Sequence, residues 1–198
     1  MSITSSCIDF ADNCDSKPSF SLSNSSTKKT KPINTKYELI YSLYNLAVWF
    51  HIKGFHLITG PNVPDKIKGM QRLRSALWCL NETKTIMSTL LSNSTEITSD
   101  INSVSFELLE NYMIGLVYST LAEVMRIDST RKAGPEKLAS TNNTAAKFFQ
   151  KAFDITNVSK QSFSSQKKNL RMKMNLLYNL TMSRSEAYLQ TSNSRSKE

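Results

Sequence analysis

The sequence predicts an all-α fold, an antiparallel bundle or short solenoid of about five long helices. Long segments carry apolar residues at three- and four-residue steps, Gly/Pro or Ser/Asn-rich stretches separate them, and no convincing strand is found. The 198 residues suffice for one domain with a hydrophobic core. We expect a disordered leader over residues 1–34, a helical domain over 35–190 and a polar tail over 191–198.

The leader is rich in Ser, Thr, Asn and Lys and contains Pro18 and Pro32. It has few large apolar residues, so it cannot offset the entropy lost on ordering. Its basic cluster, Lys28–Lys31, is typical of a solvated tail.

The first two helices are predicted over residues 35–59 and 65–91. The first has apolar residues on nearly every side, which is typical of a central helix. Gly60 and Pro61 end it, and Pro64 suits the first turn of the second helix, so a tight antiparallel hairpin follows. The second helix places an apolar stripe on one side and early basic residues on the other. A polar linker over 92–99 ends this pair.

The organising helix is predicted over residues 100–128. Glu107 and Glu110 lie near its positive end and Arg126 near its negative end, as the helix dipole favours. Two apolar sets recur along it, so we expect the helix to be sandwiched between two neighbours or to keep one face for a partner. The first set is Phe106, Leu109, Met113, Leu116, Thr120 and Val124, and the second is Leu108, Tyr112, Ile114, Leu121 and Met125.

Two further helices follow the break at Gly134 and Pro135. The helix that begins at Pro135 is expected to be interrupted or loosened over residues 140–143, because Ser, Thr and Asn favour turns. A clean amphipathic run over 145–153 comes after it. The last helix is capped within residues 162–165 and is expected to end near Gln190.

No enzyme signature is present, and we expect no catalytic residue, cofactor, metal or small-molecule substrate. Glycine-rich phosphate loops, GxSxG and HExxH are absent. Cys7, Cys14 and Cys79 form neither a disulfide framework nor a zinc pattern. His51 and His56 are interpreted as polar tips on a packed helix, and Glu107 and Glu110 as helix-start charges. No segment reaches the ~18 apolar residues of a membrane span, so we expect a cytoplasmic protein whose membrane contact is indirect.

The net charge of +9 is unevenly distributed. Residues 92–128 hold six acidic residues and one arginine, whereas residues 158–198 hold eight basic and two acidic residues. Acidic and basic helix faces that complement each other explain this pattern. Nucleic-acid binding is an alternative, but it usually brings a concentrated basic stripe that the sequence lacks.

Five segments occur in an order that resembles the Bro domain of the Alix family, over about residues 37–190. They are LYNLA at 43–47, LNET at 80–83, DINS at 100–103, KLA at 137–139 and AAKFFQKAF at 145–153. The resemblance implies a helical scaffold of the endosomal sorting machinery, without catalytic activity. The family domain is longer than this chain, and its N-terminal part and last helices have no counterpart here.

The resemblance further implies a partner, the amphipathic C-terminal helix of an ESCRT-III subunit, which binds an apolar patch flanked by charge. By position the patch falls on Leu121 and Leu138, and Lys66 and Lys68 match the charged flank loosely. Gly134 or Pro135 occupies a family apolar position, and residues 115–119 replace a small, Gln-rich stretch. The expected location is therefore cytoplasmic and endosome-associated. A helical-repeat adaptor for an unrelated peptide is the alternative.

Overall fold

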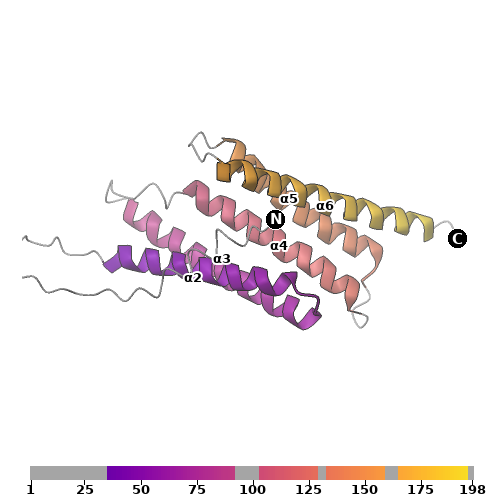
Figure 1. Ribbon diagram of the computed structural model, residues 1–198, viewed down its shortest axis with the longest axis horizontal. Helices are drawn as coiled ribbons and strands as arrows, with labels where there is room; N and C mark the ends of the chain where they lie inside the picture. Colours follow the sequence, from indigo (N-terminus) through magenta and orange to yellow (C-terminus); the bar gives the residue numbers. More distant parts are fainter. Residues whose placement is uncertain (1–34, 92–102, 129–132, 159–164, 196–198) are drawn as a thin grey trace, which may run out of the picture. The chain divides into compact units, whose positions relative to one another are not determined.

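The computed structural model describes residues 35–91, 103–128, 133–158 and 165–195. Within these ranges it contains five α-helices and no strand, which confirms the predicted all-α fold. The helices are α2 (Thr35–Thr59), α3 (Val63–Leu91), α4 (Ser103–Ile127), α5 (Pro135–Val158) and α6 (Ser165–Arg195), and each runs antiparallel to the one before it (Figure 1). The predicted leader and the predicted linker over 92–99 lie outside the described residues.

Helix α5 is continuous, so the predicted interruption over residues 140–143 is wrong. The polar side chains of this stretch bond to carbonyls one turn earlier: Thr141 Oγ1 donates to Lys137 O at 2.8 Å, and Asn142 Nδ2 donates to Leu138 O at 2.9 Å. These bonds run along the helix and do not compete with its backbone ladder. Ser, Thr and Asn are therefore accommodated inside the helix.

Helix α6 continues to Arg195, past the predicted end near Gln190. Thr191 Oγ1 donates to Ala187 O at 2.9 Å, and Ser194 Oγ donates to Gln190 O at 3.0 Å. Ser192 Oγ also donates to Glu136 Oε1 of α5 at 3.2 Å, so a contact between helices holds this last stretch. Residues 191–195, predicted to lie in a polar tail, are helical.

Helices that are consecutive in sequence pack against each other: α2 on α3, α3 on α4, α4 on α5 and α5 on α6. Helix α4 is thus sandwiched, as its two apolar sets predict. Five of the residues that it buries belong to the first set, Tyr112 belongs to the second, and Gly115, Val117 and Ala122 belong to neither. The core of the protein includes the following residues of α4: Phe106, Tyr112, Met113, Leu116, Val117 and Val124.

Glycines allow two of these helix pairs to approach closely. Gly69 of α3 faces Gly54 of α2, and a Cβ placed on Gly69 would stand 2.8 Å from Gly54 O and 2.6 Å from Ile58 Cγ2. A Cβ placed on Gly115 of α4 would stand 2.6 Å from Cε1 of Phe149 of α5, so this glycine makes room for a side-chain ring. Backbones can come this close only where no Cβ intervenes.

Candidate functional site

A pocket of about 200 Å³ opens between α4, α5 and α6. Five of its six lining side chains are polar or charged. They are Glu123 and Arg126 of α4, Asn142 of α5, and Arg184 and Tyr188 of α6, with Ala122 as the apolar member. Arg184 and Tyr188 stand four residues apart and therefore share one face of α6. Ala122 and Arg126 share one face of α4 for the same reason.

The carboxylate of this pocket is already paired with a buried lysine. Lys66 of α3 is only 4% exposed, and its Nζ donates to Ile58 O at 2.9 Å and lies 3.2 Å from Glu123 Oε2. A buried ammonium needs such partners, because removing it from water without them is costly. Glu123 is therefore neutralised from the α3 side, and its charge adds little to the pocket.

Asn142 lines the pocket, and its side-chain oxygen is shielded from solvent and unpaired. It is 1% exposed, its Nδ2 donates to Leu138 O, and its Oδ1 has no hydrogen-bond partner. The opposite orientation of the amide would place two oxygens against each other, so the Nδ2 bond fixes which atom is which. A buried acceptor without a donor costs on the order of 1–3 kcal/mol.

Two exposed arginines give the pocket a positive charge. Neither Arg126 nor Arg184 lies within ion-pair distance of a described carboxylate. With Lys66 cancelling Glu123, the two guanidinium groups leave a surplus of two positive charges. Guanidinium is the cation best suited to bidentate recognition of an anion.

None of the four predicted partner-binding residues lines this pocket, but three of them adjoin residues that do. Leu121 precedes Ala122 and is half-buried against the core, Leu138 supplies the carbonyl that holds Asn142, and Lys66 pairs with Glu123. Leu138 is itself only 7% exposed. Lys68 is exposed and lies on another face of α3, because a step of two residues turns a helix by about 200°.

Sequence reasoning missed Arg126, Asn142, Arg184 and Tyr188 as site residues. No single-helix pattern identifies them, because they become neighbours only when three helices pack. Next to the 128–134 break, Ile127 at the end of α4 is an exposed large hydrophobic residue. The lining of the pocket itself is polar, whereas the resemblance implies an apolar patch.

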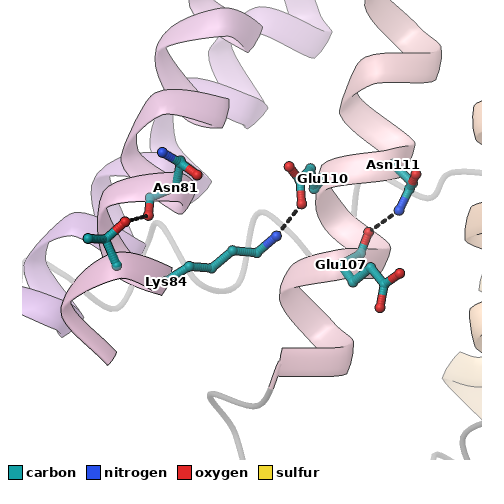
Figure 2. Close-up of polar contacts among 6 residues, drawn as sticks. Asn81, Lys84, Glu107, Glu110 and Asn111 are labelled. Atoms are coloured by element: carbon teal, nitrogen blue, oxygen red, sulfur yellow. Dashed lines mark hydrogen bonds and ion pairs between the residues drawn. The ribbon is translucent and has the colours of Figure 1, made fainter. Parts of the chain in front are cut away.

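A second ion pair joins α3 and α4 at a distance from the pocket. Figure 2 shows Lys84 of α3 extending to the Glu110 carboxylate, while the neighbouring Asn111 donates its side-chain amide to the Glu107 carbonyl at 2.8 Å. Glu110 thus serves a contact between helices. Both partners are about one-third exposed, so solvent screens this pair more than that of Lys66.

The outer face of α6 carries a row of exposed apolar side chains. Met172, Leu176 and Leu180 recur every four residues and are between 44% and 66% exposed. The exposed cations Lys168 and Arg171 lie beside the row. An apolar row with cationic neighbours has the pattern of a face that packs against another amphipathic helix.

His51 is partly buried in an aromatic cluster, whereas His56 is exposed. The ring of His51 lies 5.7 Å from that of Tyr112, and Lys173 Nζ of α6 lies 5.2 Å from the Tyr112 ring centroid. His51 Nδ1 has no hydrogen-bond partner. Burial, and then the charge of Lys173, lower the pKa of His51 to about 4.

This depressed pKa predicts a loss of stability in mild acid. His51 stays neutral in the folded state down to about pH 4, whereas the unfolded chain protonates it near pH 6.5. Its contribution to stability is therefore complete above pH 6.5 and is lost as the pH falls toward 4, by on the order of 2 kcal/mol. Urea unfolding between pH 7 and 4 measures this loss. The dependence of the free energy of unfolding on pH should become flatter in His51→Gln and should persist in His56→Gln. Equal pH profiles for the two variants would contradict the role of His51.

Neither a metal site nor a membrane-spanning helix is found in the described ranges. No group of three or more His, Cys, Asp or Glu side chains in the described ranges could hold a metal ion. Among the same residues, no helix combines the length and the apolarity that a membrane span requires.

Cys79 is buried, and burial raises the pKa of its thiol.

Comparison of the chain with protein-family models, with curated proteins and with solved structures finds no match to any of them.

Proposed function

We propose that this chain is a non-catalytic scaffold of endosomal or vacuolar sorting that binds an amphipathic helix of an ESCRT-III subunit. The observation that carries the proposal is that Lys66, Leu121 and Leu138 each adjoin a residue that lines one open pocket, although none of the three lines it. These residues come from three helices, and the resemblance implies all three as partner-binding residues. A shared location is what a common binding role requires.

The helix positions of the resembling segments also support the proposal. LYNLA lies within α2, LNET within α3, and KLA and AAKFFQKAF within α5. Of DINS, only Ser103 is described, as the first residue of α4. Long antiparallel helices of this kind present ridges between which a further helix can pack.

A binding experiment tests the proposal. A fluorescently labelled peptide from an ESCRT-III C-terminal tail should bind with a micromolar dissociation constant, measured by anisotropy. Leu121→Asp should weaken it at least tenfold, because a carboxylate replaces a half-buried apolar contact of the partner. Leu138 is unsuitable for this test, since an aspartate at a 7% exposed position would unfold the protein.

Lys53→Glu, at an exposed position of α2, serves as the control and should bind normally. Circular dichroism should show that all variants remain helical. Unchanged affinity in folded Leu121→Asp would contradict the assignment of the site.

A second candidate is an adaptor for an unrelated acidic amphipathic helix, and the exposed row on α6 favours it. Leu176 is 66% exposed, so Leu176→Asp should leave the fold intact. The same binding experiment, repeated with an acidic amphipathic peptide that is unrelated to ESCRT-III, separates the candidates. Loss of peptide binding in Leu176→Asp, with normal binding in Leu121→Asp, would assign recognition to α6.

A further inference from the structure

We propose that the outer face of α6 binds the same face of a second copy of this chain, so that two α6 helices pair in antiparallel orientation. This inference goes beyond the proposed function and is independent of it. The pocket lies on another side of α6, because Arg184 and Tyr188 stand about 80–120° around the helix from Leu176.

Helix α6 is the last helix of the array, and it leaves an apolar row uncovered. It packs mainly on α5, and on that side Ser185 Oγ donates to Ala139 O at 2.9 Å. Leu176 stands about 180° around the helix from Ser185. It belongs to the row Met172, Leu176 and Leu180, which are 62%, 66% and 44% exposed. Such a row is typical of a face that packs against a further helix.

One charge of each sign flanks this row. Lys168 and Glu186 are both exposed and stand 18 residues apart, which is about five turns, so they lie on one line about 27 Å apart. The row runs beside that line, and Leu176 lies near the midpoint along the helix axis. Within the described ranges, neither Lys168 nor Glu186 lies within ion-pair distance of an opposite charge.

The other cations of α6 whose side chains are described are directed elsewhere. The guanidinium group of Arg171 lies 5.2 Å from the centroid of the Phe153 ring, and Lys173 Nζ lies 4.9 Å from that of the Phe55 ring. Arg184 lines the pocket. The outer face therefore carries one cation at one end and one anion at the other.

This arrangement of charge is complementary to itself in antiparallel orientation. A two-fold axis through the middle of the row brings Lys168 of each copy beside Glu186 of the other, with the apolar rows between the two ion pairs. A parallel pair would instead place like charges together at both ends. A wholly acidic helix would place a like charge against Glu186. The charges therefore select a second copy, and the apolar rows supply most of the affinity, since exposed ion pairs contribute little.

Sedimentation equilibrium of the full chain tests the inference, over concentrations of about 1–200 µM. The average mass should rise from that of one chain toward that of two, with a micromolar dissociation constant. The face of one helix is smaller than a standard interface of roughly 1,600 Å², so tighter association is not expected.

Leu176→Asp should weaken the dimer at least tenfold, because it brings two carboxylates together at the centre of the interface. The position is 66% exposed, so the variant should fold, and circular dichroism checks that it remains helical. Leu189→Asp is the matched control. Leu189 is 47% exposed on the same helix but lies about 140° around it from Leu176, so this variant should dimerise normally.

Charge reversal tests the antiparallel orientation. Lys168→Glu and Glu186→Lys should each weaken the dimer roughly fivefold, because each places like charges together at both ends of the interface. The variant that carries both substitutions should recover the original dissociation constant. In a parallel pair the single substitutions would exchange one set of like charges for another and would have little effect. Added salt should reduce the differences among these variants.

The remaining outcomes overturn the inference. A chain that stays monomeric at about 200 µM would do so, even if the acidic amphipathic peptide binds α6, and the proposed function would still stand. A mass that rises beyond two copies would indicate head-to-tail association. A dimer that persists in helical Leu176→Asp would place the interface elsewhere, and single charge reversals without effect would exclude the antiparallel pair.

Discussion

Gly69→Ala is expected to lower the free energy of unfolding by about 3 kcal/mol. The added Cβ would stand 2.6 Å from Ile58 Cγ2, 2.8 Å from Gly54 O and 2.9 Å from Ile58 N. Two of these atoms belong to the backbone of α2 and cannot rotate away, so α2 and α3 must separate. That separation loosens the packing of both helices, and its cost exceeds the roughly 1 kcal/mol that alanine gains from its higher helix propensity.

Urea unfolding followed by circular dichroism measures the change. The urea concentration at the midpoint should fall, while the slope of the free energy against urea concentration should stay constant. Gly134→Ala is the control, because a Cβ at that position meets nothing within 4 Å. It should be neutral or should stabilise the protein by up to about 1 kcal/mol, through the lower entropy of the unfolded chain. Equal midpoints for Gly69→Ala and the unmodified chain would show that α2 and α3 do not cross as closely as described.

Glu123→Ala is expected to cost about 3 kcal/mol. It removes the carboxylate partner of Lys66 and leaves a 4% exposed ammonium held only by Ile58 O. The comparison is Glu110→Ala, which breaks the ion pair with Lys84. The side chains of Lys84 and Glu110 are 33% and 36% exposed. That substitution should cost less than about 1 kcal/mol, because water replaces the lost partner.

Unfolding in urea measures both variants under the same conditions. Lys66→Met in the Glu123→Ala background should recover part of the lost stability, since an apolar side chain of similar length leaves no uncompensated charge. Similar costs for Glu123→Ala and Glu110→Ala would contradict the difference in burial between the two pairs.

The fold could be predicted because helix periodicity is a local property. The apolar sets of α4 recur within one helix, and glycine and proline mark the α2–α3 turn within five residues. The continuity of α5 could not be predicted this way. Asn142 and Thr141 have side chains that suit either a turn or a bond to the preceding helical turn, and packing against α4 and α6 decides between them.

The candidate site was predictable only in part, for a related reason. Lys66 could be identified as a charged residue early in its helix, but its burial depends on Glu123 of another helix. The residues that line the pocket come from α4, α5 and α6, and the register of these helices is set by packing. Periodicity within one helix gives no information on the relative register of two helices.

The contact of Lys173 with Phe55 has a consequence for how the chain folds. An array in which each helix packs mainly on its sequence neighbours has low contact order, which favours folding within milliseconds and allows one end to open while the other stays formed. Lys173 Nζ of α6 lies 4.9 Å from the Phe55 ring centroid of α2, so it joins elements more than 100 residues apart. Such a link ties the opening of the last helix to that of the first, and it favours unfolding of the described helices as a single cooperative unit.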